Sequence, residues 1–186
     1  MRLVVAITGS SGAIYGVNFL EACRKLDIET DLIITRDGEK LISLELGKTA
    51  KEVRKLATRS YAPDEMTAPI ASGSFRTDGM VIVPCSMKTL AAVAGGIAFN
   101  LVTRAADVTL KQNRPLVLVP RETPLNLIHL ENMTKLKRAG ATILPAAPAY
   151  YQRPKTIFDL ADFISGRILE ILGVKHNLYK PWGGLK

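Results

Sequence analysis

Side chains able to bind an anion or to move a proton recur directly after apolar runs of this 186-residue chain. They stand in five short segments: Gly9–Gly12, Thr35–Arg36, Cys85–Thr89, Arg121–Glu122 and the stretch around Tyr151. Hydroxyl, ammonium, guanidinium and carboxylate groups are those that hold phosphates and transfer protons. If the apolar runs are parallel strands, the segments share the edge at which open α/β sheets bind ligands. The sequence therefore predicts an anion-binding site at that edge.

Two of these segments combine hydroxyl groups with the start of a predicted helix. Ser10 and Ser11 stand between glycines ahead of a helical pattern, where free backbone N–H groups favour an anion. The glycine spacing does not match Gly-x-Gly-x-x-Gly, so an ordinary β–α turn with a serine cap is the alternative. Ser86 and Thr89 repeat this arrangement, and the helix dipole disfavours the cation Lys88 in a first turn unless an anion lies nearby. We expect anion or flavin contact at both segments.

Arg121 and Glu122 directly follow Pro120 at the end of another apolar run. An adjacent pair of opposite charges can be a surface feature of little consequence. At the ligand edge of a sheet, however, a guanidinium binds phosphate in a fork and a carboxylate transfers a proton. Both interpretations of this pair stay open from the residues alone.

Other patterns point away from common enzyme classes. Tyr151 and Lys155 have the spacing of the catalytic pair of short-chain dehydrogenases, but Pro154 opposes the helix that this pair requires. Asp159 and Asp162 lie in the polar stripe of a predicted helix, which favours a solvated face over a metal site. Neither histidine of the chain lies in one of the five segments, so neither a catalytic triad nor a zinc site is predicted.

Alternating strands and helices are predicted to bring the five segments together. Continuous apolar runs, typical of strands covered on both faces, predict strands at 3–8, 29–35, 80–83, 116–119 and 141–144. Helical spacing of apolar residues predicts helices at 13–26, around 41–46, at 125–139 and at 157–172. The predicted fold class is α/β, with a doubly wound, mostly parallel sheet in a Rossmann-like, three-layer αβα arrangement. Residues 1–186 are expected to form a single domain with an irregular tail over about 175–186.

The composition is that of a soluble globular protein, with 47% hydrophobic and 23% charged residues. A net charge of +8 raises the question of nucleic-acid binding, but the basic positions available for it lack interleaved aromatic residues. They are better explained as a solvated helix face, and they are Lys48, Lys51, Arg54, Lys55 and Arg59. The remaining positive charge suits a small anionic substrate.

The sequence shows no sign of a membrane span or of secretion. The longest apolar region, 89–102, is too short to cross a bilayer, and the chain runs from Arg2 straight into a strand-like run. Cys23 and Cys85 stand far apart, which indicates neither a disulfide framework nor a thiolate metal site. We therefore expect a cytoplasmic protein that binds neither membrane nor nucleic acid.

Together, the motifs of the chain resemble those of the UbiX flavin prenyltransferases, nearly from end to end, in order and with compatible spacing. They are Thr8-Gly-Ser-Ser-Gly-Ala13, Glu45, Ala68-Pro-Ile-Ala-Ser-Gly-Ser74, Pro84-Cys-Ser-Met-Lys-Thr-Leu90, Arg104-Ala-Ala-Asp107, Pro120-Arg-Glu-Thr-Pro124, His129-Leu-Glu-Asn-Met133 and Leu144-Pro-Ala-Ala-Pro148. The resemblance implies a homo-oligomeric flavoprotein, dodecameric in the family, that acts without a metal. Such an enzyme joins the dimethylallyl group of dimethylallyl monophosphate to N5 and C6 of reduced FMN, and the prenylated FMN serves UbiD-type decarboxylases.

The resemblance also implies roles for residues of this chain. FMN would be held by Gly9, Ser10, Ser11, Thr35, Ser86, Met87, Lys88, Thr89, Arg104 and Arg121. The prenyl phosphate would be bound by Lys111, Arg121, Glu122, Tyr151 and Arg167, some of them reaching across a subunit interface. Trp182 would stabilise the allylic cation through its π face if the tail folds over the site. Proton transfers would fall to Ser11, Glu45 and Glu122.

Three alternatives stay open beside this resemblance. An FMN-dependent cysteine decarboxylase of the same fold uses a histidine base early in the chain, whereas this chain has none before His129. An NADP-dependent short-chain dehydrogenase would place Arg36 on the 2′-phosphate, but the glycine spacing and Pro154 count against it. A non-catalytic flavin-binding module is the third, because FMN binding does not by itself prove turnover.

Overall fold

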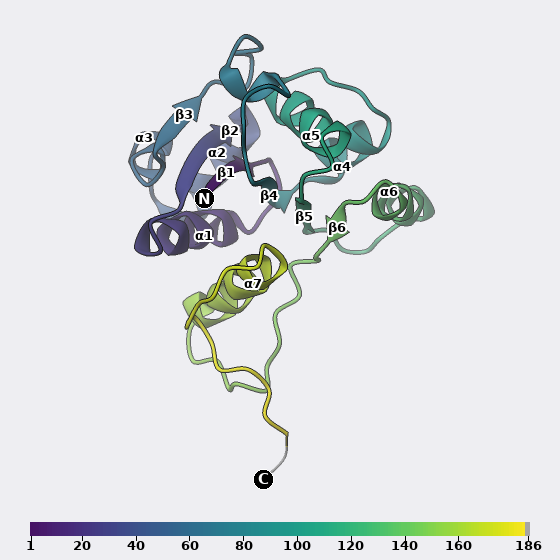
Figure 1. Ribbon diagram of the computed structural model, residues 1–186. Helices are drawn as coiled ribbons and strands as arrows, with labels where there is room; N and C mark the ends of the chain where they lie inside the picture. The colour runs from purple at the N-terminus through teal and green to yellow at the C-terminus, as the bar shows by residue number, and fades with distance from the viewer. Residues whose placement is uncertain (185–186) are drawn as a thin grey trace.

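Six parallel strands form the centre of the molecule (Figure 1), in the order β3-β2-β1-β4-β5-β6. The computed structural model describes residues 1–184. The strands are β1 (Arg2–Ile7), β2 (Glu29–Ile34), β3 (Arg59–Tyr61), β4 (Gly79–Cys85), β5 (Leu116–Pro120) and β6 (Thr142–Ile143). The strand order reverses between β1 and β4, and this reversal is the switch point where such sheets bind ligands. The predicted doubly wound parallel sheet is confirmed, and β3 is a strand that the sequence pattern did not predict.

Helices cover both faces of this sheet, which confirms the predicted three-layer arrangement. They are α1 (Ala13–Lys25), α2 (Arg36–Leu46), α3 (Ala50–Arg54), α4 (Met87–Ala94), α5 (Leu101–Lys111), α6 (Leu127–Arg138), α7 (Ile157–Ile171) and the short 3-10 helix η1 (Pro69–Ala71). Side chains of β1 alternate between two cores: Leu3, Val5 and Ile7 pack with α1 and α7, whereas Val4 and Ala6 pack with α4 and α5. Burial on both faces explains the continuous apolar runs of the central strands.

Side-chain caps start three helices at the carboxyl edge of the sheet: α2 directly after β2, α4 directly after β4, and α5 after the loop that follows α4. The hydroxyl oxygens of Thr35 and Ser86 accept hydrogen bonds from N–H groups in the first turns of α2 and α4, and the Asn100 amide oxygen does so for α5. Each cap satisfies one of the free N–H groups of a helix start and leaves the others facing outward. The caps therefore fix polar groups along one edge of the sheet.

The helix α1 lies very close to the sheet because Gly16 has no side chain. A Cβ atom at Gly16 would approach the carbonyl oxygen of Val83 to 2.4 Å. The helix α7 covers α1 in turn, and the Asn18 amide group donates to the Asp162 carboxylate at 2.8 Å while accepting from the Ser165 hydroxyl at 2.6 Å. Asp162 is thereby a structural partner of α1, and the Asp159 carboxylate accepts from the Lys155 and Thr156 N–H groups before α7.

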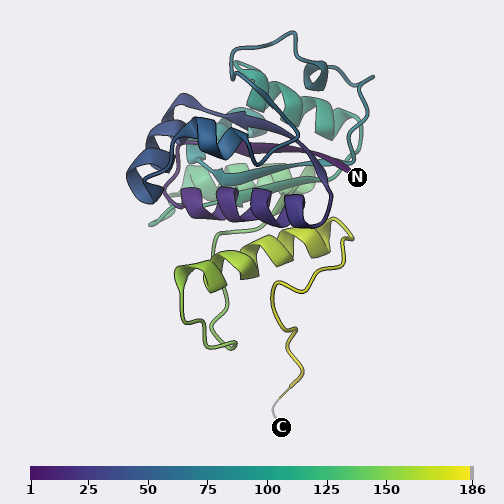
Figure 2. The same cartoon turned by 90° about the vertical axis from the view of Figure 1, so that its left-hand side faces the viewer.

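The tail after α7 contains neither helix nor strand over 173–184, and Figure 2 shows it extending from the body of the molecule. It first folds back on α7, where the rings of Tyr179 and Phe163 lie 4.8 Å apart between centroids. Gly166 makes room for this contact, because a Cβ atom there would lie 2.5 Å from the Tyr179 ring. The stretch between Tyr151 and Lys155 is a turn and loop, so the helical catalytic pair of a dehydrogenase is absent from it, as predicted.

The five basic residues predicted to share one helix face do not all lie on one helix: only Lys51 and Arg54 belong to α3. Arg59 belongs to β3, and its guanidinium donates to the Asp31 carboxylate at 2.7 Å and to the Glu29 carboxylate at 2.8 Å. Arg54 pairs with the Glu39 carboxylate. The helical pattern failed because α3 ends at Arg54 and a short polar edge strand follows it. Carboxylates neutralise several of these cations, which leaves little free charge for a phosphate backbone. No helix within 1–184 is long and apolar enough to cross a membrane.

Candidate active site

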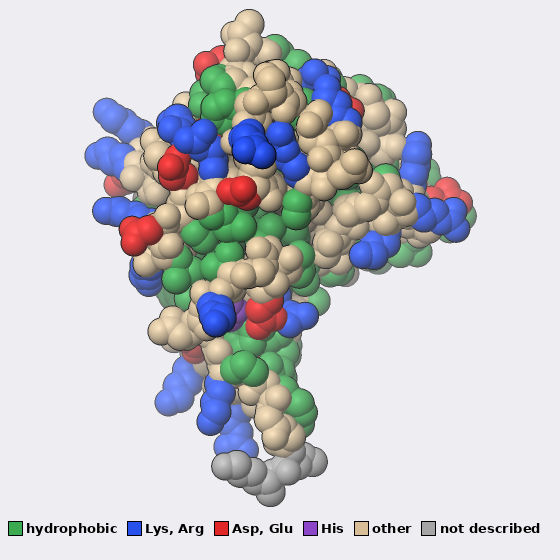
Figure 3. Space-filling view, viewed as in Figure 1, with side chains coloured by type: hydrophobic (Ala, Val, Ile, Leu, Met, Phe, Trp, Pro, Cys, Tyr) green, Lys and Arg blue, Asp and Glu red, His purple; other side chains and the backbone are tan. Residues whose placement is uncertain are grey.

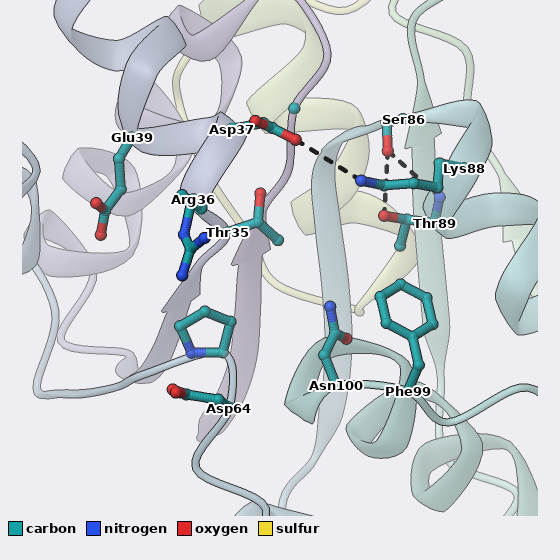
Figure 4. A pocket seen from close by; sticks show the side chains of 12 residues that line it. Thr35, Arg36, Asp37, Glu39, Asp64, Ser86, Lys88, Thr89, Phe99 and Asn100 are labelled. Carbon is teal, nitrogen blue, oxygen red and sulfur yellow. Dashed lines mark hydrogen bonds and ion pairs between the residues drawn. The ribbon is translucent and has the colours of Figure 1, made fainter.

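A cavity of about 810 Å³ opens at the switch point of the sheet. It lies beyond the carboxyl ends of β1, β2 and β4, and Figure 4 shows its lining side chains pointing toward one another from α2, α4 and the loop before α5. Five of the predicted cofactor-binding residues line it: Gly9, Thr35, Ser86, Lys88 and Thr89. The cavity thus lies at the sheet edge where the sequence predicts an anion-binding site.

The hydroxyl groups on the α4 side of the cavity are held by a buried network. The Thr8 hydroxyl, which is 1% exposed, donates to the carbonyl oxygen of Pro84 at 2.8 Å and accepts from the Ser86 N–H at 2.8 Å. The Ser86 hydroxyl lies 3.1 Å from that of Thr89 and also accepts from the Thr89 N–H. This network ties the end of β1 to the end of β4, so the two hydroxyls and the start of α4 have a fixed position. Hydroxyls and N–H groups at a helix start suit a phosphate.

An ion pair forms part of the cavity lining. The Lys88 ammonium lies 3.6 Å from one Asp37 carboxylate oxygen, and the Lys40 ammonium donates to the other at 3.1 Å. Lys40, and to a lesser extent Lys88, hold the pKa of the Asp37 carboxyl below its ordinary value. Gly9 is required beside this pair, because a Cβ atom there would lie 2.5 Å from the Cβ of Asp37. The side chain of Lys88 is 71% exposed, so its ammonium can reach an anion placed in the cavity.

A second group of predicted residues lies between the ends of β1 and β5. The Ser10 hydroxyl donates to the carbonyl oxygen of Arg121 at 2.6 Å and so fixes the Arg121 backbone beside the glycine segment. The side chains of Arg121 and Glu122 are exposed. Tyr15 lies beside Arg121; burial, followed by a lesser effect of Tyr150, raises the pKa of the Tyr15 hydroxyl, which the Arg121 charge partly offsets.

The Glu45 carboxylate occupies the start of α1. One of its oxygens accepts from the N–H groups of Gly12 at 2.9 Å and Ala13 at 2.8 Å. Gly12 itself is in the left-handed conformation with φ of 103° and offers no side-chain cap, so Glu45 takes the place of one. The helix N-terminus that the sequence predicts as a phosphate site is therefore filled by a carboxylate of the same chain. Ser11, directly before Gly12, lies partly exposed next to it.

Three further predicted residues, Met87, Arg104 and Lys111, also lie outside the cavity in the single chain. Met87 packs against the core cluster on the α4 face of the sheet. Arg104 donates to the carbonyl oxygen of Ala71 at 3.1 Å and pairs with Asp107 at 2.8 Å, which holds the η1 loop against α5. Lys111 ends α5, roughly 15 Å along the helix from the cavity-lining Asn100. Lys111 therefore lies toward the opposite edge of the sheet.

Tyr151, Arg167 and Trp182 gather around α7 and not at the cavity. The rings of Tyr151 and Trp182 meet edge to face at 5.2 Å, so the tail packs on the Tyr151 loop instead of folding over the cavity of its own chain. Arg167 pairs with Glu170, and its hydrogen bond with Tyr179 raises the pKa of its guanidinium. The expectation for Trp182 thus fails within one chain, because Phe163 and Tyr151 offer the tail a nearer aromatic surface.

Sequence reasoning missed several residues that line the cavity. Phe99, with 53% of its surface exposed, points its ring toward Thr89 in Figure 4, and Asn100 lies beside it. Asn100 carries a recognisable signal, since it forms a capping box with Thr103 at the start of α5. Phe99 has no such signal, because an aromatic residue in a loop does not reveal which surface it faces.

The cavity fits a phosphorylated aromatic cofactor better than a metal ion. Its lining combines hydroxyls, an ammonium and a helix start with the exposed ring of Phe99, which lies next to Thr89 in Figure 4. Across residues 1–184, no group of three or more His, Cys, Asp or Glu side chains is placed to hold a metal ion. A ligand with a phosphate and a flat aromatic ring would match these groups, and a flavin mononucleotide provides both.

Comparison with known proteins gives the same class. Residues 1–169 match the family model described as Flavoprotein. The chain is 47% identical to the flavin prenyltransferase UbiX of Methanocaldococcus jannaschii, over 98% of this chain and 99% of that protein. It is also 47% identical to the mitochondrial flavin prenyltransferase PAD1 of Saccharomyces cerevisiae, over 100% of this chain and 76% of that protein.

Solved structures agree with these relatives. The crystal structure of AnUbiX (PadA1) in complex with FMN and dimethylallyl pyrophosphate has a TM-score of 0.98 and 46% identity, covering 100% of this chain and 98% of that one. A dodecameric FMN-dependent UbiX-like decarboxylase from Escherichia coli O157:H7 has a TM-score of 0.97 and 46% identity, covering 99% and 100%. The cypemycin decarboxylase CypD, at 18% identity and a TM-score of 0.67, shares the fold alone. The chain belongs to the UbiX flavin prenyltransferase family.

Proposed function

We propose that this protein transfers a dimethylallyl group from dimethylallyl monophosphate to N5 and C6 of reduced FMN. The observation that carries the proposal is the pairing of two anion-binding regions at one sheet edge. The cavity at β1, β2 and β4 offers Thr35, Ser86, Thr89 and Lys88, and the adjoining region at β1 and β5 offers Arg121 and Glu122. Two phosphates, one that stays on the cofactor and one that leaves, account for both regions.

FMN would be held by the cavity, with its phosphate toward the hydroxyls of Thr35, Ser86 and Thr89 and the ammonium of Lys88. When bound in its reduced form, FMN supplies the nucleophilic atoms of the reaction. The buried network of Thr8 fixes the Ser86 backbone before any ligand arrives, so these donors need little reorganisation on binding. The Ser10 hydroxyl does the same for the backbone of Arg121.

Breaking the allylic C–O bond places negative charge on the departing phosphate. Arg121 stands at the site in the same chain, and its exposed guanidinium can donate two hydrogen bonds to that phosphate. Lys111, Tyr151 and Arg167 carry the remaining donors but lie away from the cavity of their own chain. We therefore propose that they act on a neighbouring copy in a homo-oligomer; a solved relative is itself dodecameric. Trp182 would reach the allylic carbon from there.

Proton movements fall to carboxylates near the two regions. Ring closure releases one proton, and the exposed Glu122 beside Arg121 can accept it together with the departed phosphate. The Glu45 carboxylate, held by two N–H groups at the start of α1, lies next to Ser11 and would control protons there. None of these steps calls for a metal ligand set.

The product would be the cofactor of a UbiD-type decarboxylase, and the whole chain 1–186 would act as one flavin-binding domain. One continuous sheet with a core on each face supports the single domain. We also propose a cytoplasmic location, supported by two buried cysteines that are both free.

Two substitutions test these roles. Glu45→Gln keeps an oxygen that can accept from α1 but removes the charge, and Arg167→Ala removes a donor far from the FMN cavity of its own chain. Both variants should retain FMN, measured by flavin absorbance after gel filtration, and lose at least tenfold in prenylation rate. Exposed Arg24→Ala on α1 serves as the matched control for Arg167. Prenylation at the wild-type rate in both variants would show that neither Glu45 nor Arg167 has the proposed role in the reaction.

A further inference from the structure

A cluster of polar side chains joins α7 to the tail that follows it, and the Glu170 carboxylate lies at its centre. Its Oε2 accepts from the Arg167 guanidinium, and its Oε1 accepts from the Tyr179 hydroxyl. The Nε2 atom of His176 lies 3.5 Å from the same Oε1. Figure 3 shows basic and acidic side chains beside a mostly covered histidine over α7 and the tail. The two oxygens of Glu170 thus face different segments, one an arginine of α7 and the other two residues of the tail.

The tail side of this cluster is held by packing and hydrogen bonds. The His176 side chain is 6% exposed, and its Nδ1 accepts from the Leu178 N–H at 3.2 Å. A neutral imidazole with Nδ1 as acceptor carries its proton on Nε2, so an N–H edge faces the carboxylate. The tail lies directly on α7 here, since a Cβ atom at Gly166 would lie 2.6 Å from the His176 ring. Burial, followed by the hydrogen bond to Glu170, raises the pKa of the Tyr179 hydroxyl, which therefore stays a donor at neutral pH.

Arg167 keeps donors available for a ligand within this arrangement. Its side chain is 46% exposed, and the pairing with Glu170 uses Nη1. A guanidinium has five N–H donors in a fixed fork, so the others can still bind a phosphate. A partly exposed ion pair contributes little to the stability of a fold. Ordering a long side chain before its ligand arrives, however, removes part of the entropy cost of binding.

We infer that Glu170 is a positioning residue for Arg167, and that the tail anchors Glu170 so that an already ordered guanidinium meets the prenyl phosphate. The inference rests on the proposed role of Arg167 in binding that phosphate. It gives Glu170 itself no contact with substrate or flavin. A carboxylate that instead competed with the phosphate for Arg167 would have the opposite effect on substrate affinity, so the direction of the change decides between the two.

Glu170→Gln tests this role, because it keeps the shape of the side chain and removes its charge. The KM for dimethylallyl monophosphate should rise at least fivefold, while kcat stays within twofold and FMN retention is unchanged. Glu21→Gln on α1 is the matched control, since the Glu21 side chain is 37% exposed against 34% for Glu170 and also pairs with a cation, Lys48. This control should have wild-type constants. A KM for Glu170→Gln at or below the wild-type value would overturn the inference.

A double-mutant cycle separates positioning from a merely structural role. In an Arg167→Ala background, Glu170→Gln should raise KM by less than 1.5-fold, because the residue through which Glu170 acts is already gone. A structural role would act in both backgrounds. A rise of fivefold again in the Arg167→Ala protein would therefore contradict the inference.

Tyr179→Phe covers the case in which Glu170→Gln loses its fold or its flavin. It keeps the aromatic ring against Gly166 and Phe163 and removes only the hydroxyl that holds Glu170. Its KM should rise at least twofold with unchanged far-UV circular dichroism, and a wild-type KM would overturn the inference. Failure of the proposed function is distinguishable: a wild type that forms no prenylated FMN sinks the function and the inference with it, whereas an active wild type with an unaltered Glu170→Gln sinks the inference alone.

Discussion

Replacement of Thr8 by valine should destabilise the fold and loosen the cofactor cavity at once. The Thr8 hydroxyl is buried and makes two hydrogen bonds of 2.8 Å, one to the Pro84 carbonyl and one from the Ser86 N–H. Valine keeps the shape but removes the acceptor of the Ser86 N–H, whereas the Pro84 carbonyl still accepts from the Thr8 N–H at 3.3 Å. An unsatisfied buried polar group costs about 1–3 kcal/mol, so the loss of the Ser86 acceptor together with one of the two bonds to Pro84 predicts a fall of about 2–3 kcal/mol in unfolding free energy.

Thr8→Ser is the matched control for this substitution. It keeps the hydroxyl and removes one buried methyl group, which costs about 1 kcal/mol. Urea unfolding of both variants, at one fixed protein concentration because assembly adds to apparent stability, gives the difference directly. FMN affinity should fall in Thr8→Val, since Ser86 loses its backbone tether, and stay near wild type in Thr8→Ser. Equal stability of the two variants would refute the reasoning.

Two further predictions concern the cofactor donors and the thiols. Ser86→Ala with Thr89→Ala should weaken FMN retention at least tenfold while costing about 1 kcal/mol of stability through the lost α4 cap; full FMN occupancy in gel-filtered protein would move the phosphate elsewhere. Burial raises the pKa of the Cys23 thiol to about 12 and raises that of Cys85 as well, so neither should react with a thiol-specific disulfide reagent at pH 8 until the chain is unfolded. Because the folded-state pKa of Cys23 is higher than its unfolded-state value, burial of the neutral thiol stabilises the fold below pH 9.0, the ordinary pKa, and this stabilisation is lost as the pH rises toward 12. Rapid labelling of the folded protein at pH 8 would contradict the predicted protection of the two thiols.

The elements predicted best from sequence are those with a long uninterrupted pattern. The predicted helix 157–172 corresponds to α7 at Ile157–Ile171, and the predicted strand 3–8 to β1 at Arg2–Ile7. The strand β3 was missed because Arg59–Tyr61 is short and polar, and its place in the sheet depends on the Asp31 carboxylate of β2. The helix α5 was missed because the apolar region 89–102 joins the end of α4 to its start, and the loop between them interrupts no hydrophobic run.

The site residues also differ in how well the sequence predicts their position. Residues that directly follow strands, such as Thr35, Ser86 and Lys88, line the cavity because parallel strands bring their carboxyl ends to one edge. Arg104, Lys111 and Arg167 lie on helices, where the position of a side chain depends on tertiary packing and on neighbouring subunits. No local pattern reports these contacts. The role of Glu45 at the start of α1 likewise depends on how α2 packs against α1, which joins residues more than thirty positions apart in sequence.

The central claim concerns what happens to the flavin. The purified protein should be incubated without oxygen with reduced FMN and dimethylallyl monophosphate, and in parallel with the diphosphate, and the released flavin should be analysed by mass spectrometry. The account predicts a flavin heavier by one C5H8 unit with the monophosphate, and loss of this product when Arg121 is replaced by alanine. Unmodified FMN with both donors, in protein that is assembled and saturated with flavin, would contradict it.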